Sequence, residues 1–138
     1  MKSILVDTGF WFALYNKKDQ HYNEAQELIG YLSRYEIIIP YPTLYETVNT
    51  RFSKNTKQLE EFRSLLRGNN FKFIDDTRYI EGLLDQTFDS ALNLKPYSLV
   101  DMVIRRILDD NTIRISSMIT FNKGDFIDVC QRRNIAFI

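Results

Sequence analysis

Short apolar segments alternate along this chain with segments whose apolar residues recur at helical spacing. The expected strands are residues 4–6, 36–39, 71–74, 115–119 and 135–138. The expected helices are residues 10–15, 21–32, 42–52, 56–66, 80–92, 98–108 and 126–132. Regular alternation of strand and helix is typical of parallel sheets that carry helices on both faces. The sequence therefore predicts a three-layer α/β/α fold around a five-stranded, mainly parallel sheet.

Two of the expected helices, 42–52 and 56–66, follow one another between the second and third strands, where we expect a helical hairpin. The chain has 138 residues, of which 44% are hydrophobic. This is enough apolar material for one compact core and too little length for two ordinary domains. No internal repeat or linker interrupts the pattern, so we expect residues 1–138 to form a single domain.

Cysteine and histidine each occur once, as Cys130 and His21. An intrachain disulfide is therefore excluded, and so is a zinc site built from several thiolates or imidazoles. The apolar run at residues 9–15 is too short to span a bilayer, and Asp7 interrupts any signal peptide. We expect a cytoplasmic protein with no membrane segment, whose mature chain starts at Met1.

Basic and acidic residues balance at 18 each, so the net charge gives no argument for nucleic-acid binding. Basic residues do cluster locally, as Lys17-Lys18, Arg51 with Lys54 and Lys57, Arg63 with Arg67, Arg105-Arg106, and Arg132-Arg133. A solvated helix face is the simpler interpretation of each single cluster. Any attraction for nucleic acid must therefore be local.

Four acidic residues lie where an apolar segment ends or a helix begins: Asp7, Glu46, Asp101 and Asp125. The carboxyl ends of parallel strands meet at one edge of a sheet, which is where such folds bind ligands. Each acid also has a purely structural explanation. Asp7 and Asp125 can cap the helices that follow them. The patterns Thr43-x-x-Glu46 and Ser98-x-x-Asp101 match a capping box or an acidic first turn of a helix.

Helix capping does not explain why all four acids should share one edge, whereas a divalent ion needs hard oxygen ligands from several chain segments. Crowded carboxylates repel, and without a cation at least one of them would hold a proton at neutral pH. Mg²⁺ or Mn²⁺ removes this repulsion, acidifies a water that can attack phosphorus, and stabilises charge on the phosphoryl oxygens. The four acids together therefore predict metal-dependent phosphodiester cleavage.

Four short motifs strengthen this prediction: Val6-Asp7-Thr8 with Trp11, Pro42-x-x-x-Glu46, Ser98-Leu99-Val100-Asp101, and Thr120-Phe121-Asn122 followed by Asp125-Phe126. In order and spacing they resemble the motifs of PIN-domain ribonucleases, above all the VapC-like toxins of prokaryotic toxin–antitoxin pairs. The resemblance covers essentially the whole chain. It implies a PIN-like fold and an endoribonuclease that hydrolyses RNA with metal-activated water. It assigns the catalytic and metal-binding roles to Asp7, Glu46, Asp101 and Asp125, with Mg²⁺ or Mn²⁺ as cofactor.

The resemblance also implies supporting residues and partners. Thr8 and Ser98 match polar residues that orient carboxylates or metal-bound water, and Asn122 matches a position that is often acidic. Because Asn122 carries no charge, a second ion would be held only when substrate is present. Gly9 stands where serine is common. The implied partners are an RNA substrate, a cognate antitoxin that masks the acidic groove, and a second subunit in a homodimer.

The main alternative is a non-catalytic PIN-fold module that binds RNA or protein, against which the intact acids argue. A phosphatase of the haloacid type needs Asp-x-Asp after its first strand, and Gly9 stands at the second position. A phospho-receiver domain would place its acceptor at Asp75 or Asp76, but Asp7 lacks the acidic neighbour that such a domain needs. The sequence has no glycine-rich phosphate loop and no Gly-x-Ser-x-Gly motif.

Several other residues have simpler roles. Phe10 and Trp11 can stack on bases, but aromatic residues beside a strand end more often belong to the core. His21 precedes an amphipathic helix and is interpreted as a surface or capping residue, not a catalytic one. Asp75-Asp76 is interpreted as the cap of the helix that follows it.

Overall fold

The strands of the protein form one parallel sheet. The computed structural model describes residues 1–48, 54–93 and 95–138. Within these ranges the strand order is β3-β2-β1-β4-β5, and every neighbouring pair is parallel. The strands are β1 (Ser3–Val6), β2 (Glu36–Pro40), β3 (Phe71–Ile74), β4 (Ser117–Ile119) and β5 (Ala136–Phe137). The predicted five-stranded sheet is confirmed.

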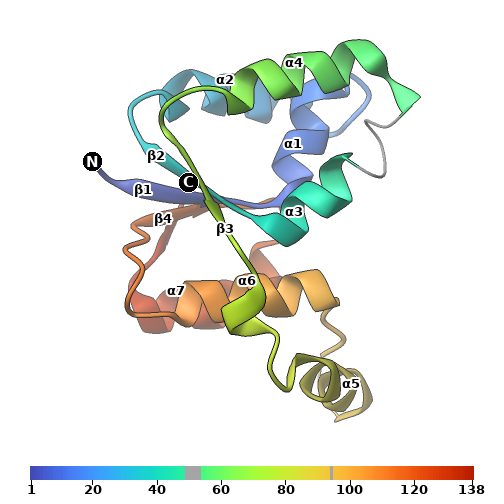
Figure 1. Cartoon of the computed structure of the whole chain (residues 1–138), viewed down its shortest axis with the longest axis vertical. Helices are drawn as coiled ribbons and strands as arrows, with labels where there is room; N and C mark the ends of the chain where they lie inside the picture. Colours follow the sequence, from blue (N-terminus) through green and yellow to red (C-terminus); the bar gives the residue numbers. More distant parts are fainter. Residues whose placement is uncertain (49–53, 94) are drawn as a thin grey trace.

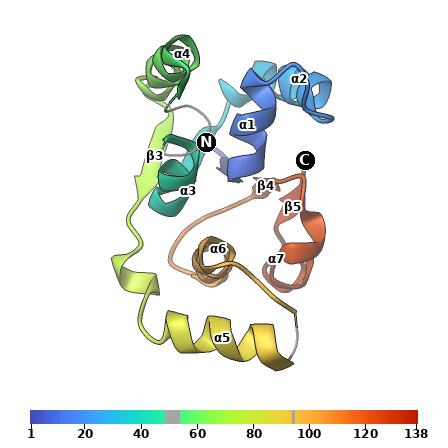
Figure 2. The ribbon, with the colours of Figure 1, turned by 90° about the vertical axis from the view of Figure 1, so that its right-hand side faces the viewer.

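Helices cover both faces of this sheet (Figures 1 and 2). They are α1 (Thr8–Tyr15), α2 (Tyr22–Leu32), α3 (Tyr41–Glu46), α4 (Thr56–Leu66), α5 (Leu83–Asn93), α6 (Leu99–Asp109) and α7 (Ile127–Arg133). Helices α1, α2 and α4 cover one face and α6 and α7 the other, while α5 lies outside α6 (Figure 2). The predicted three layers are therefore confirmed. Among the described residues, no helix combines the length and apolar content needed to cross a bilayer.

The central strands are buried on both faces. In β1, Ile4 and Val6 point into the core that contains Trp11 and Phe62, whereas Leu5 points into the core beneath α6 and α7. All five side chains are at most 1% exposed. A strand covered on both faces reads as a continuous apolar run, because neither set of alternating side chains meets water. This explains why β1 shows no polar alternation.

The aromatic residues after β1 belong to the core. The Trp11 ring lies 5.0 Å from Phe10, edge to face, and 5.4 Å from Phe62 between ring centroids. Phe10 and Trp11 are both fully buried. The core interpretation is confirmed, and neither ring can receive a nucleobase.

Two helices lie between β2 and β3, as predicted, although the expected residues Arg51 and Phe52 lie outside the described residues. The predicted capping box at Thr43 is wrong. Helix α3 begins at Tyr41 with Pro42 in its first turn, where the fixed φ and missing N–H of proline are tolerated. Thr43 therefore lies inside the helix and cannot cap it.

The helix predicted at residues 80–92 begins later, at Leu83. Gly82 has a φ of 66°, a left-handed conformation that glycine adopts readily and that does not continue a helix. A 3₁₀ turn, η3 (Thr77–Tyr79), precedes it. The Asp75 carboxylate accepts hydrogen bonds from the Thr77 N–H and hydroxyl, at 2.7 and 2.5 Å. Asp75, and not Asp76, is therefore the side chain that accepts the hydrogen bonds at the start of this turn.

Candidate active site at the carboxyl edge of the sheet

The four predicted acids lie at the edge where the parallel strands end. Asp7 follows β1 directly, Glu46 ends the helix after β2, and Asp101 lies in the first turn of α6. Asp125 lies in a 3₁₀ turn after β4, η4 (Lys123–Asp125). The charges of Asp101 and Glu46 both act on Asp7, and those of Asp125 and Glu46 act on Asp101. Folding thus brings four distant segments into one electrostatic cluster.

Asp7 is the buried member of this cluster, with 5% of its surface exposed. Its Oδ1 accepts a hydrogen bond of 2.7 Å from the Thr8 N–H, so Asp7 caps α1 as the local sequence suggested. Its Oδ2 accepts a hydrogen bond of 3.0 Å from the Thr120 hydroxyl. The Asn122 N–H donates to the Thr120 oxygen over 3.0 Å, which directs the hydroxyl hydrogen toward Asp7. Both carboxylate oxygens of Asp7 are therefore held in place.

The cluster favours either a proton or a cation. Burial raises the pKa of Asp7 from 3.8 to about 6, and the like charges of Asp101 and Glu46 add to this rise. The hydrogen bonds from Thr8 and Thr120 act in the opposite direction without cancelling it. The pKa of Asp101 is also raised, first by burial and then by the charge of Asp125. Two carboxylates of this edge are therefore costly to ionise without a compensating positive charge.

Two of the predicted supporting residues contact the acids directly. The buried Thr8 hydroxyl donates a hydrogen bond of 2.7 Å to Glu46 Oε1 and so joins α1 to α3. Ser98 is the N-cap of α6, and its Oγ accepts a hydrogen bond of 3.0 Å from the Asp101 N–H. The capping interpretation of Ser98 is confirmed. Asn122 contacts the cluster through its backbone N–H, which donates a hydrogen bond to the Thr120 hydroxyl.

Sequence reasoning missed two basic residues at Asp125. The Lys95 ammonium lies 2.8 Å from Asp125 Oδ1 and donates a hydrogen bond of 3.0 Å to the Gly124 carbonyl. Arg105 donates a hydrogen bond of 2.7 Å to the Asp125 carbonyl and pairs with Asp128. Arg105 stands four residues after Asp101 on α6, a spacing that places both on one helix face and that could have been read from the sequence.

Sequence reasoning also missed Thr120 as a separate site residue, although it belongs to one of the motifs. The suggested capping role of Asp125 is wrong, because Phe126 precedes α7 as its N-cap and no side-chain hydrogen bond caps that helix. Asp125 is instead the last residue of η4, whose position Arg105 secures. A short turn leaves its carboxylate half-buried beside Lys95.

Besides Arg105, two of the described residues in the basic clusters form ion pairs on helix surfaces. Arg63 pairs with Glu60 at 3.3 Å on α4, and Arg132 pairs with Asp109 at 3.1 Å between α7 and α6. These pairs fit the interpretation of solvated helix faces. Arg51 lies outside the described residues.

The donor set suits a hard divalent ion, since all four acids offer carboxylate oxygens. Across residues 1–48, 54–93 and 95–138, no three histidine, cysteine, aspartate or glutamate side chains lie close enough to hold one metal ion together. Magnesium is usually bound by only one or two carboxylates and keeps several waters. A pair of carboxylates at this edge is therefore sufficient for its chemistry.

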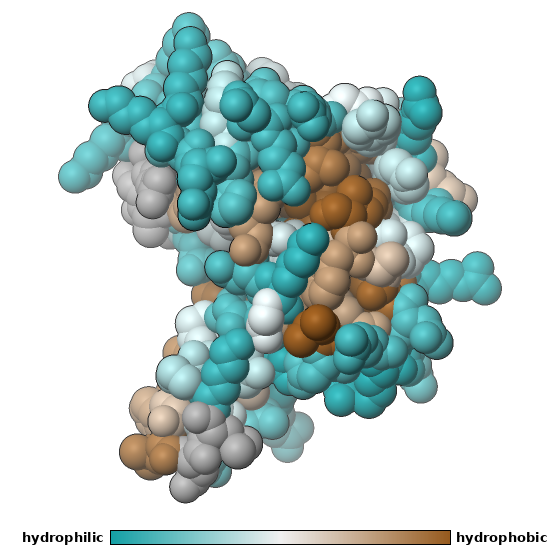
Figure 3. All heavy atoms as spheres, turned by 180° about the vertical axis from the view of Figure 1, so that it is seen from behind, coloured by the Kyte–Doolittle hydropathy of each residue, from teal (hydrophilic) through white to brown (hydrophobic). Residues whose placement is uncertain are grey.

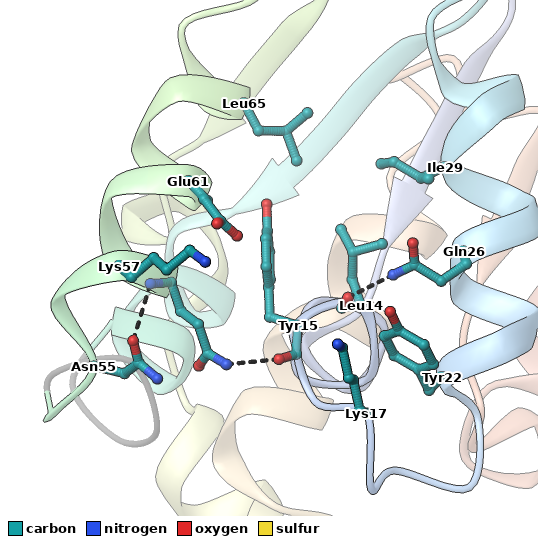
Figure 4. Close-up of a pocket in the computed structure, with 11 residues that line it drawn as sticks. Leu14, Tyr15, Lys17, Tyr22, Gln26, Ile29, Asn55, Lys57, Glu61 and Leu65 are labelled. Carbon is teal, nitrogen blue, oxygen red and sulfur yellow. Dashed lines mark hydrogen bonds between the residues drawn. The ribbon is translucent and has the colours of Figure 1, made fainter.

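A cavity of about 480 Å³ lies away from the acids, between α1, α2 and α4 (Figure 4). Gln58 of α4 donates a hydrogen bond of 2.6 Å to the Tyr15 carbonyl, and Gln26 of α2 donates one of 2.7 Å to the Leu14 carbonyl. The Tyr15 ring points between α4 and α2 toward Leu65 (Figure 4). None of the four acids lines this cavity, so it is distinct from the candidate active site.

No protein-family model matches this sequence, and no curated protein sequence is significantly similar to it. Among solved structures, this chain is similar to VapC20 of Mycobacterium tuberculosis, which is described as a sarcin–ricin loop cleaving toxin. The TM-score is 0.67 at 19% sequence identity, and the match covers 91% of this chain and 94% of the toxin. The likeness shows a shared fold. At the level of fold, it confirms the resemblance to VapC-like toxins that the motifs predicted.

Proposed function

We propose that this protein is a Mg²⁺- or Mn²⁺-dependent endoribonuclease and the toxin of a type II toxin–antitoxin pair. One observation carries the proposal. Four carboxylates from four chain segments meet at the carboxyl edge of a parallel sheet, where burial and mutual repulsion raise the pKa of Asp7 to about 6. The fold shared with a toxin described as cleaving the sarcin–ricin loop supports RNA as the substrate.

Each acid has a neighbour that positions it. Thr120 and the Thr8 N–H orient Asp7, and the Thr8 hydroxyl orients Glu46. Ser98 fixes the turn that carries Asp101. A carboxylate oxygen that accepts one hydrogen bond keeps a second lone pair, so these contacts leave room for metal coordination. We assign metal binding and catalysis to the set Asp7, Glu46, Asp101 and Asp125, of which a pair of carboxylates would bind the ion directly.

The cofactor and the basic residues have complementary roles. A bound Mg²⁺ or Mn²⁺ would supply an acidic water as the nucleophile and offset charge on the phosphoryl oxygens. Arg105 holds the backbone of the Asp125 turn against α6. Lys95 neutralises Asp125 while its side chain remains 47% exposed, so its ammonium can move to a phosphate of bound RNA.

Cleavage of bulk RNA tests the proposal. The wild type should cleave RNA when Mg²⁺ or Mn²⁺ is present, and Asp7→Asn should not. The products should carry 5′-phosphate and 3′-hydroxyl ends, because water and not the ribose 2′-hydroxyl is the nucleophile. Glu27→Gln removes an exposed carboxylate of α2 and is the matched control, which should cleave like the wild type. Cyclic phosphate ends, or equal cleavage by Asp7→Asn, would contradict the proposal.

A non-catalytic module that binds RNA or protein is the second candidate. The ion pair between Lys95 and Asp125 favours it, since this pair already neutralises one acid without a metal. RNA binding with no cleavage by any variant, at any Mg²⁺ or Mn²⁺ concentration, would support this candidate over the nuclease.

An antitoxin and a second subunit are the proposed protein partners, and a cytoplasmic location would follow from such a pairing. Helix α5 presents Leu84, Phe88 and Leu92 at intervals of four residues, and each is more than half exposed. Seen from behind, the lobe where α5 lies carries apolar surface (Figure 3). An exposed apolar helix stripe suits a homodimer interface. Light scattering should therefore report a dimer for the wild type and a monomer for Phe88→Glu.

A further inference from the structure

A second cavity, of about 450 Å³, adjoins the candidate active site. Its walls include Gly9, Lys18, His21, Phe121 and Asn122. Gly9 belongs to the first turn of α1 and follows Asp7 and Thr8. Asn122 is the N-cap of η4, the turn that contains Asp125. The cavity therefore shares two of its walls with the segments that carry the acids.

An aromatic pair forms one wall of this cavity. The His21 and Phe121 rings are nearly parallel, with centroids 4.1 Å apart and an angle of 5° between the ring planes. Phe121 also contacts the fully buried Phe10, at a centroid distance of 6.4 Å. Phe121 thus links the His21 ring to the core. Its side chain remains 34% exposed.

The position of His21 fits its interpretation as a surface or capping residue, since it is partly exposed at the start of α2. His21 is the N-cap residue of α2, but its side chain makes no capping hydrogen bond. Its backbone N–H donates a hydrogen bond of 2.8 Å to Asp19 Oδ1, and its Nδ1 lies 3.7 Å from Glu24 Oε2. These contacts and the stacking on Phe121 hold the imidazole flat at the cavity wall. A held, partly exposed flat ring is a stacking platform for a nucleobase.

The rim of the cavity is polar. Lys18 is exposed and carries a positive charge, and its backbone N–H donates a hydrogen bond of 3.1 Å to the Asn16 side chain. Asn16, Gln20 and Asn122 offer amide donors and acceptors around the same opening. Unpaired RNA bases are recognised by stacking on a ring while their polar edges bond to such groups, and a cation beside the ring suits the adjoining phosphate.

We propose that this cavity binds one unpaired base of a single-stranded RNA, stacked on His21, next to the phosphate that is cleaved. The inference rests on the proposed ribonuclease function and extends it to the recognition of a nucleotide beside the cleaved bond. His21 is a substrate-binding residue in this assignment, and Phe121 positions it.

Binding without cleavage tests the site. The probe is a short oligouridine that carries one 2-aminopurine, mixed with Asp7→Asn protein in EDTA. Stacking quenches 2-aminopurine fluorescence, so the quench reports the base on the ring. In the Asp7→Asn protein, the further substitution His21→Ala should abolish the quench and weaken binding about tenfold, since loss of one stacked base changes affinity by that order. His21→Tyr keeps a flat ring and should retain both signals.

Phe121→Leu should reduce the quench by releasing His21, whereas Glu27→Gln should change neither signal. A duplex of the same sequence should compete poorly, because its bases are stacked on one another. The site is overturned if the Asp7→Asn protein binds the probe without quenching, or if His21→Ala binds and quenches as well as its parent. Cleavage separates the two ideas. RNA cleavage by the wild type alongside a failed stacking test leaves the nuclease standing, and a positive stacking test without cleavage leaves only the base site.

Discussion

Thr120 and Asp7 are 113 positions apart in the sequence, and the Thr120 hydroxyl donates a hydrogen bond of 3.0 Å to Asp7 Oδ2. The contact exists because β4 pairs with β1, with Ile119 opposite Val6, so the residues after both strands emerge side by side. The Asn122 N–H orients this hydroxyl by donating to its oxygen. The candidate active site is therefore built on the pairing of the first and fourth strands.

The stability of the metal-free protein should depend on pH through Asp7. Its pKa in the folded protein, about 6, lies above the ordinary value of 3.8. The stability that this group contributes is therefore fully present below about pH 3.8 and is lost as the pH rises through about 6. Asp7→Asn removes this loss. Between pH 3.5 and pH 8, the free energy of unfolding of Asp7→Asn should gain about 3 kcal/mol on that of the wild type.

Chemical denaturation in EDTA at several pH values measures this difference. The Glu27→Gln control should follow the wild type at every pH. If the free energy of unfolding changed with pH in the same way for the wild type and Asp7→Asn, the pKa of Asp7 would be the same in the folded and unfolded protein.

Metal binding should compete with protonation of Asp7. Below its pKa of about 6, the carboxyl holds a proton that an incoming ion must displace. Mn²⁺ affinity should therefore fall by up to about tenfold per pH unit below that pKa, and binding near pH 6 should release a proton. Calorimetric titration with Mn²⁺ in two buffers of different ionisation enthalpy measures both quantities. Affinity that stays constant from pH 5 to pH 7.5 would exclude Asp7 from the metal site.

Thr120→Val should destabilise the protein and impair its activity. The substitution keeps the side-chain shape but removes the hydroxyl that donates to Asp7 Oδ2, and it leaves a buried oxygen without that partner. The expected loss is about 1–3 kcal/mol in the free energy of unfolding at neutral pH. The pKa of Asp7 should rise further, because this hydrogen bond lowers it. Thr120→Ser restores the donor and should restore stability. Equal stability of the Val and Ser variants would show that the hydrogen bond contributes nothing.

Lys95→Met should lower the Mg²⁺ concentration needed for half-maximal RNA cleavage by a few fold. The Lys95 ammonium lies 2.8 Å from Asp125 Oδ1, where it competes with a metal ion for the same carboxylate. If the ammonium also contacts a phosphate of the RNA, the maximal rate should fall at saturating Mg²⁺. Lys2→Met, at an exposed lysine before β1, is the matched control and should change neither value. A higher Mg²⁺ requirement in Lys95→Met would contradict competition between the ammonium and the ion.

Local sequence was sufficient for the type and order of the elements and for two of the polar contacts of the site. The apolar runs predicted the strands because a strand buried on both faces needs no polar alternation. Asp7 caps α1 and Ser98 caps α6 through bonds that span one and three residues, so their patterns were visible in the sequence. Thr43 was misread because the same pattern of hydroxyl and acid also fits inside a helix whose start Pro42 sets. Gly82 has a left-handed backbone, so α5 begins after it and not at residue 80. This conformation could not be inferred from residue type alone.

The sequence by itself determined the alternation of elements and the acids that follow them, because strand burial and helix capping act between near neighbours in the chain. Only the tertiary structure decided which side chains meet at the sheet edge. Thr120 reaches Asp7, Lys95 reaches Asp125 and His21 stacks on Phe121 across separations that no local pattern records. Such contacts depend on strand order and on the packing of helices against the sheet, which arise from the whole chain at once.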